Sequence, residues 1–461
     1  MKRRTFGTYA GVSMAALKFG YAKAQTSKDP SLLKTTLTPM GSERAGNADG
    51  SIPAWTGGYT TVPEGWQPGD FMPDPFANEQ PVAVINASNM SQYVDKLSDG
   101  VMAMMTRYGF SIKVYPTHRS HALPQWIYDN IASNLNTAKL DPGGARLGFT
   151  NAYGGYPFPI PDVSDPFVAG AQIIYNHETR WVGSNNIQKN SGWVVNAGQP
   201  AFTQAAVTQY QYPYYDPSGS SATFQGMLWR QHNKLLGPAN LTGEEIVEWN
   251  YTDPYTHPAQ LWELLSGQGR VRRAPELMFD APSQFADGLI NYDEYSIFIQ
   301  SLQEYDWKYL GKKELYIPYN NNELIGQPLE QTMKAQFLDP NVVRWELHRV
   351  WIVEANVHQG ERNVLVRRRF YVDEDCWTVA VGDAYDANGN LFHVAFNYFY
   401  LRPDLPGLAY LKNQTTNNLQ ANGYVVADGV WGEKGDPSVK FNVSMSPSVF
   451  DPENMAASAQ Y

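Results

Sequence analysis

The chain has 461 residues, of which 43% are hydrophobic, 13% aromatic and only 17% charged. This balance excludes a disordered chain or a coiled coil, and the 29 Tyr and 13 Trp favour β-sheets that bury large side chains between them. The net charge of −10 excludes a nucleic-acid-binding protein, because affinity for phosphates depends on clustered Lys and Arg.

Residues 1–24 have the features of an export signal. Arginines at positions 3 and 4 precede an apolar stretch that Lys18 interrupts, and this stretch is shorter than the roughly 20 residues that span a bilayer. The small-x-small sequence ending at Ala24 predicts cleavage before Gln25. The twin arginines favour the route that exports folded proteins, and an ordinary secretory signal is the alternative. We therefore expect the rest of the chain in the periplasm, not spanning a membrane.

The chain has one cysteine, Cys376, far from the expected cleavage site. We expect neither an intramolecular disulfide nor a lipid attached at a new N-terminus. Cleavage removes five basic residues and no acidic one, which takes the net charge from −10 to −15. The expected product is a soluble, acidic protein that is not a lipoprotein.

Residues 25–105 are expected to form an extended, Gly- and Pro-rich segment followed by a helix, both packed on the main body. Apolar residues at Tyr93, Leu97 and Val101 predict that helix between Met90 and Tyr108. A second helix is predicted over Pro124–Leu140, which begins with proline and has an apolar stripe.

From Gln172 onward a period of two predicts successive β-strands. The expected strands before residue 320 are Ala171–Trp181, Gly192–Ala197, Ala222–Gln231, Glu245–Tyr251, Leu261–Leu265, Gly269–Glu276, Leu289–Ile299 and Tyr305–Ile317. Between Val343 and Tyr400 we expect a meander of further hairpins, one of which turns at Asn388-Gly389. Residues 106–400 are therefore expected to form one antiparallel sheet domain, and residues 401–461 a loop-rich part of the same domain.

Six segments of the chain are distinctive. They are TPMGSERAGN (38–47), IPAWTGG (52–58), VYPTHR (114–119), GGYPFPIP (154–161), NHETR (176–180) and RRFYVDEDCW (368–377). With these segments the chain resembles an uncharacterised proteobacterial family of exported proteins, often labelled as similar to outer-membrane lipoprotein-sorting proteins. The resemblance covers essentially the whole mature chain.

The resemblance implies a fold and a role. The fold would be mainly β with a few helices (α+β): a curved antiparallel sheet, or incomplete β-barrel, that wraps plug helices and holds acyl chains in the cavity between them. The role would be a periplasmic binding or shuttle protein for lipids or other long hydrophobic molecules. Its implied partners are an outer-membrane protein or a resistance-nodulation-division exporter.

The candidate ligand site combines aromatic walls with polar contacts near the mouth. The walls would be Trp345, Trp351, Phe370, Trp377, Phe396 and Tyr398, and the polar contacts His177, Arg180 and Arg349. A curved sheet must either fill its concave face with side chains or enclose a cavity, so a filled core explains the aromatic residues equally well. Similarly, a buried ion pair of Glu178 or Arg180 is the alternative to a head-group contact.

The sequence has no catalytic motif, so we expect no enzyme, no cofactor and no metal. The His118 and His121 pair lacks the further ligands of a zinc site. The pattern from Asp383 to Asn390 lacks the glutamate of a calcium loop, and a hairpin turn explains it better. Two alternatives stay open: a lipid-modifying enzyme that uses His118/His121 or His177/Glu178, and an accessory subunit of an outer-membrane or exporter complex that binds no ligand.

Overall fold

The computed structural model describes residues 28–67, 70–274, 280–409, 413–430, 432 and 439–458. The expected export signal at 1–24 lies outside these residues. No helix in the described ranges is both long and apolar enough to cross a membrane.

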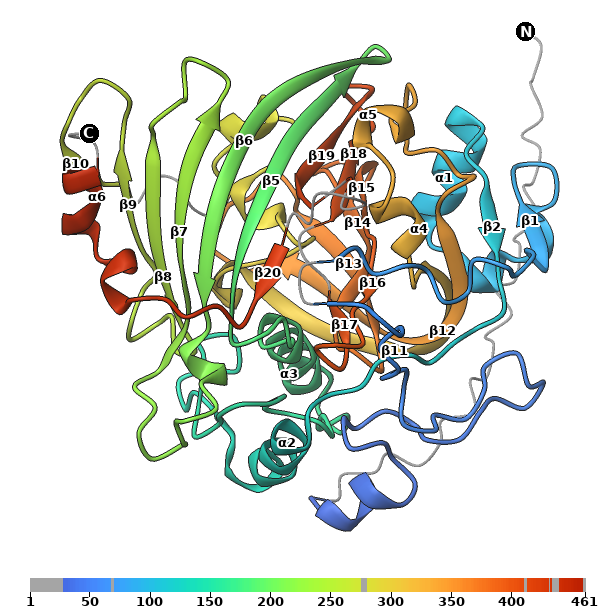
Figure 1. Cartoon of the computed structure of the whole chain (residues 1–461). Coiled ribbons are helices and arrows are strands. Elements are labelled where there is room, and N and C mark those ends of the chain that lie inside the picture. The colour runs from blue at the N-terminus through green and yellow to red at the C-terminus, as the bar shows by residue number, and fades with distance from the viewer. Residues whose placement is uncertain are drawn as a thin grey trace, which may run out of the picture.

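One curved sheet of 16 strands dominates the structure (Figure 1). Its strand order is β1-β2-β12-β13-β14-β15-β18-β19-β5-β6-β7-β8-β9-β10, with β11 paired to β12 and β20 paired to β5. Its pairs are antiparallel except for β2 with β12. The predicted mainly β fold, built on a large curved and open antiparallel sheet, is confirmed.

The strands and helices have the following bounds. The strands are β1 (Ala83–Ile85), β2 (Ile112–Val114), β3 (Lys139–Leu140), β4 (Phe149–Thr150), β5 (Asn185–Asn196), β6 (Gln199–Gln211), β7 (Met227–Gly237), β8 (Glu245–Tyr251), β9 (Gln260–Leu264), β10 (Val271–Arg273), β11 (Tyr305–Pro318), β12 (Arg344–Val357), β13 (Arg367–Asp373), β14 (Val379–Tyr385), β15 (Leu391–Asn397), β16 (Tyr400–Leu401), β17 (Leu408–Ala409), β18 (Gln414–Asn418), β19 (Gly423–Gly429) and β20 (Val439–Phe441). The helices are α1 (Asp99–Tyr108), α2 (Gln125–Thr137), α3 (Pro166–Glu178), α4 (Asn322–Ile325), α5 (Leu329–Thr332) and α6 (Pro452–Ser458).

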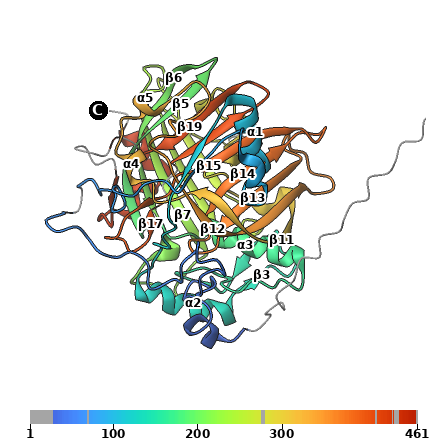
Figure 2. The same cartoon turned by 90° about the vertical axis from the view of Figure 1, so that its right-hand side faces the viewer.

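The predicted meander is present as β12, β13, β14 and β15, which pair in chain order. The turn before β15 is closed by Asp386, whose carboxylate accepts from the backbone N–H groups of Asn388 and Asn390. Helix α1 packs on β14 and β15 (Figure 2), with Gly100 against the side chains of Asp383 and Val394. The predicted boundary at residue 105 falls inside this helix.

The C-terminal segment, expected to be loop-rich, contributes strands to the centre of the sheet. Strands β18 and β19 lie between β15 and β5 and so join the two halves of the sheet. The prediction missed β18 because its sequence, Gln414-Thr415-Thr416-Asn417-Asn418, is polar on both faces although every one of its residues is buried. Side-chain hydrogen bonds replace apolar contacts here: Gln414 donates to the carbonyl of Glu294 at 2.8 Å.

Two predicted strands are wrong. Residues 171–181 lie mostly in α3, which begins at Pro166 because Asp165 caps the N–H groups of Phe167 and Val168. The helix approaches β11 closely, since a Cβ on Gly170 would meet the carbonyl of Trp307 at 2.5 Å. Residues 289–299 form an irregular segment with one 3₁₀ turn, Tyr292–Glu294.

That irregular segment belongs to a longer loop, residues 281–303, which we call the inner loop. Its apolar residues pack against β5–β9, where Phe285 and Tyr292 join a cluster with Ile246. On its other side it is held to the meander by two buried ion pairs, Asp293 with Arg368 and Glu294 with His393. Because it contacts both halves of the sheet, the inner loop lies inside the curve.

Candidate functional site

The six predicted wall residues are buried in two separate hydrophobic clusters. Trp345, Phe396 and Tyr398 belong to the cluster of α1, and Trp351, Phe370 and Trp377 to the cluster of α3. All six are at most 7% exposed, and neighbouring rings fill the space around them: Trp351 stacks on Trp377 with centroids 5.5 Å apart. Whether any of them contacts a ligand stays a prediction.

The three predicted polar contacts do not meet at one place. His177 is buried and uses both ring nitrogens on backbone groups, since Nδ1 accepts from the N–H of Val379 and Nε2 faces the carbonyl of Phe298 at 3.0 Å. Burial lowers its pKa well below the ordinary value, so the imidazole is neutral. Arg180 donates to the carbonyl of His177 at 2.7 Å. Arg349 lies elsewhere, beside Glu374.

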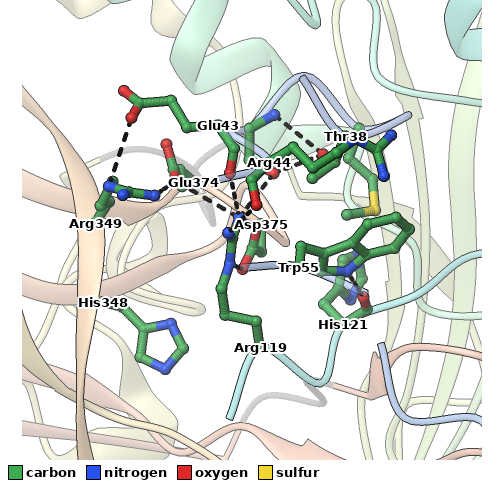
Figure 3. A network of polar contacts seen from close by, with 12 residues as sticks. Thr38, Glu43, Arg44, Trp55, Arg119, His121, His348, Arg349, Glu374 and Asp375 are labelled. Carbon is green, nitrogen blue, oxygen red and sulfur yellow. Dashed lines mark hydrogen bonds and ion pairs between the residues drawn. The ribbon is translucent and has the colours of Figure 1, made fainter. Parts of the chain in front are cut away.

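Arg349 belongs to a buried polar network (Figure 3), which we call the latch. The guanidinium of Arg119 binds both carboxylate oxygens of Asp375, at 2.7 and 2.8 Å, and donates to the carbonyl of Glu43 at 2.7 Å. Although burial opposes ionisation, Arg119 lowers the pKa of Asp375 to about 2. Three of the six distinctive segments, 38–47, 114–119 and 368–377, meet in this network. Their shared role is to fasten the N-terminal segment to the sheet.

A cavity of about 480 Å³ lies between the last turn of α3 and the neighbouring ends of β7 and β8. The inner loop closes one side of it with residues 300–303. Tyr255, which is 60% exposed, stands at its rim. The apolar and aromatic lining residues are Phe149, Tyr175, Leu228, Trp229, Tyr251, Pro254, Tyr255, Pro258, Ala259 and Leu302.

Two polar side chains of α3 face this cavity. Tyr175 and Glu178 are one helical turn apart, so they lie on the same side of the helix. The hydroxyl of Tyr175 and the Oε1 atom of Glu178 are buried, and neither has a hydrogen-bond partner among the described residues. Burial raises the pKa of Glu178 to about 8, against the opposing charge of Arg180, and raises that of Tyr175 well above its ordinary value. Both groups are therefore protonated and uncharged at pH 7.

The cavity continues into two narrow hollows of about 40 and 60 Å³ on the inner face of the sheet. The first shares Glu178 and Trp229 with the cavity, and the second shares Gln300. Amide side chains such as Gln231 and Asn233 line the second hollow. Aromatic and apolar side chains thus predominate around the cavity and the first hollow, and amide and carboxyl side chains are more frequent around the second.

Of the residues predicted to form the site, Arg180 lines one of these hollows. Residues of β7, of β8 and of the loop after β8 were missed, because their alternation gives no sign of which face lacks a neighbour. One weak signal was present: the run Tyr251–Ala259 concentrates Tyr and Pro directly after a strand. The segment 176–180 was singled out correctly as polar, but as a helix end it turns His177 into the core and Glu178 to the cavity.

The histidines proposed for an enzyme have separate partners. His118 lies 2.7 Å from Glu79 and stacks on Phe76, with ring centroids 3.9 Å apart. His121 is buried, its Nε2 lies 3.2 Å from the hydroxyl of Tyr156, and burial lowers its pKa to about 4. Neither His118 nor His121 lines the cavity described above.

Comparison with known proteins places the chain in a family. Residues 84–456 match the model of a family described as a protein of unknown function, DUF1329. The chain is 35% identical, over 98% of both proteins, to the uncharacterized protein PA3922 of Pseudomonas aeruginosa.

Two solved structures are similar at lower levels. A DUF1329 family protein from Desulfovibrio piger is 14% identical with a TM-score of 0.42, covering 63% of this chain and 99% of that one. A putative outer membrane lipoprotein-sorting protein domain from Vibrio parahaemolyticus is 12% identical, with the same TM-score and coverage. The family resemblance read from the sequence is confirmed, and the chain belongs to DUF1329, a family of proteins of unknown function.

Proposed function

We propose that this protein is a non-enzymatic periplasmic carrier that binds a long, largely apolar molecule in the cavity between α3 and strands β7 and β8. The observation that carries the proposal is the cavity itself: about 480 Å³ bounded mainly by aromatic and apolar side chains. Pockets that take small molecules have volumes of roughly 300–1,000 Å³, mostly apolar walls and a few polar groups.

The lining favours binding over catalysis. Among the described residues around the cavity there is no histidine or cysteine, and the hydroxyl of Ser301 therefore has no imidazole base beside it in the lining. His177, one residue before Glu178, uses its nitrogens on backbone groups instead. A group that binds without reacting fits this environment best.

The place of action and the partners follow from the N-terminal sequence and the family. The twin-arginine-like segment before Gln25 supports export to the periplasm. An outer-membrane protein or a resistance-nodulation-division exporter would then supply or receive the ligand.

Native mass spectrometry of the mature protein, purified from its own periplasm and followed by organic extraction, tests the proposal. We expect one equivalent of a co-purifying apolar molecule. In Ala259→Trp an indole would occupy the cavity, so the bound molecule should be lost, while Ala335→Trp, on the exposed surface, should retain it. A clean mass without ligand, and no uptake from a lipid panel, would overturn the carrier proposal and favour an accessory subunit.

A further inference from the structure

Two polar side chains of α3 that line the cavity restrict the class of ligand. We infer, on the basis of the proposed carrier function, that Tyr175 and Glu178 bind the polar end of an amphiphile, and that this end is a small uncharged hydrogen-bonding group such as a hydroxyl, carbonyl or amide. The two side chains lie one turn apart on α3, and both line the cavity.

Both side chains have unused hydrogen-bonding capacity. The hydroxyl of Tyr175, a residue only 3% exposed, and the Oε1 atom of Glu178 are buried without a partner among the described residues. A buried polar atom without a partner costs roughly 1–3 kcal/mol of stability. Both residues line an open volume, in which a ligand can supply the missing partner.

The charges around the cavity disfavour an ionic ligand. Its lining and that of the two hollows contain the carboxyls of Glu178 and Glu248 and one cation, Arg180. Arg180 is already engaged, since it donates to the carbonyl of His177. The carboxylate of Glu248 accepts from the amides of Gln231 and Asn250, at 2.7 and 2.8 Å. An anion would enter a low-dielectric space beside carboxyl groups, where an uncompensated charge is costly.

A cation is also unfavoured at neutral pH, because the carboxyl that faces the cavity directly is Glu178. The charged or titratable side chains around this end of α3 are those of Arg180, Tyr210, Tyr212 and Tyr251 in the linings, and those of Asp141, Arg146 and Asp253, whose charges act on Tyr175. Because burial raises the pKa of Glu178, its carboxyl is neutral and can both donate and accept a hydrogen bond. Together with the phenol of Tyr175 it complements a hydroxyl or a carbonyl.

The first hollow, which Glu178 also lines, limits a polar group that enters it. A site needs at least about 10–15 Å³ to hold one water molecule. A hollow of about 40 Å³ therefore accepts a few atoms and not a sugar or a phosphodiester. The ligand class that fits is a long-chain or polycyclic apolar body with one small neutral polar group.

Three ten-carbon amphiphiles of one chain length test this inference: decanol, decanoate and decylammonium at pH 7. Their affinities for the full mature protein would be measured by displacement of the apolar fluorescent probe N-phenyl-1-naphthylamine. We expect decanol to bind at least tenfold more tightly than either ion. Equal or tighter binding of decanoate or decylammonium would overturn the neutral-ligand inference and leave the carrier proposal intact. If neither the probe nor any of the three binds, the carrier proposal itself fails.

Two Tyr→Phe variants test whether the polar group of the ligand contacts α3. Tyr175→Phe removes only an unpartnered hydroxyl, so decanol should bind three- to tenfold more weakly while probe binding and thermal stability are maintained or improved. Tyr424→Phe is the matched control, because its buried hydroxyl donates to the carbonyl of Lys334 at 2.8 Å, away from the cavity. It should lose stability and keep decanol affinity. Unchanged decanol binding in both Tyr175→Phe and Glu178→Leu would exclude these residues as the contact.

Discussion

The two halves of the sheet use their inner faces differently. In the half formed by β12–β15, large rings such as Trp351, Phe370 and Trp377 occupy the space between the sheet and its covering elements. In the half formed by β5–β9, the inner face has amides and hydroxyls, and the inner loop leaves a cavity beside Trp229. The more aromatic half is the filled one, and the more polar half is hollow.

This difference follows from the interactions that aromatic and amide side chains form. Aromatic rings gain free energy by packing together, and each fully buried ring contributes roughly 1.5–3 kcal/mol, so a ring-rich face closes on itself. Amide side chains instead bond along the sheet, as Asn190, Thr208 and Asn233 do across β5, β6 and β7. A sheet face whose polar side chains hydrogen-bond to one another in this way needs fewer residues packed on it and can border open space.

Breaking the ion pair of the latch should destabilise the filled half of the sheet without altering the hollow half. In Arg119→Met the carboxylate of Asp375 loses its buried partner, and removing one member of such a pair costs roughly 3–5 kcal/mol. The free energy of unfolding, from urea denaturation, should fall by that amount. Arg107→Met, at an exposed position on α1, is the control and should change it by less than about 0.5 kcal/mol.

Probe affinity of the folded fraction of Arg119→Met should equal that of the native protein, because Arg119 does not line the cavity. A loss of affinity without a loss of stability would contradict the assignment of the latch as a structural element.

Truncating one aromatic residue in each half gives the most direct test of the comparison. Phe396→Ala, in the filled half, should lower the free energy of unfolding by roughly 3–5 kcal/mol and leave decanol affinity unchanged. Trp229→Ala, at the cavity, should cost no more than about 2 kcal/mol, because the ring is only half-buried, and should weaken decanol binding at least tenfold. If calorimetry shows instead that Phe396→Ala weakens decanol binding and Trp229→Ala does not, the ligand binds at the aromatic walls predicted from the sequence.

The filled half also contains a carboxyl that makes stability depend on pH. Burial raises the pKa of Asp383 to about 7 from an ordinary 3.8, although Ser98 and Tyr371 donate to it. The folded state therefore holds a proton that the unfolded state has lost. This contribution to stability is complete below pH 4 and is lost as the pH rises to about 7.

In Asp383→Asn that loss should disappear. Well above pH 7 the variant should be more stable than the native protein by roughly 4 kcal/mol, and below pH 4 the two should be equal. Thermal unfolding at pH 4 and pH 8 measures the difference. A variant with the same pH dependence as the native protein would show that Asp383 ionises normally.

The alternating strands were the part that sequence could predict. In β12–β15 the alternation indicates strands, and a turn sequence such as Asn388-Gly389 sets the hairpin before β15. Isolated strands with the same pattern were equally clear, since Glu245–Tyr251 is β8 with the predicted bounds. Where one face of a strand is apolar and the other polar, the local sequence is enough to predict the strand.

The cavity, helix α3 beside it and the strand that joins the two halves could not be predicted in the same way. Strand β18 is polar on both faces, so periodicity cannot reveal it. Helix α3 looked like a strand because of its Ile and Tyr residues, although Asp165-Pro166 was a helix-start signal that could have identified it. The cavity depends on how far the inner loop fills a space between distant strands, and that is a tertiary property that no local pattern reports.

A substitution at the rim of the cavity should have the smallest effect on ligand affinity. It tests whether the rim helps to capture the ligand or to retain it. Tyr255 is 60% exposed and lines the mouth, so it contacts a ligand on one side only. Tyr255→Ala should weaken probe binding by roughly 0.5–1.5 kcal/mol, about two- to tenfold, with no change in unfolding free energy. Stopped-flow fluorescence should place the change in the dissociation rate, because an exposed ring slows escape once the ligand is bound. A larger loss than that of Trp229→Ala would mean that the ligand lies at the surface, and that the interior polar groups of α3 serve the fold instead.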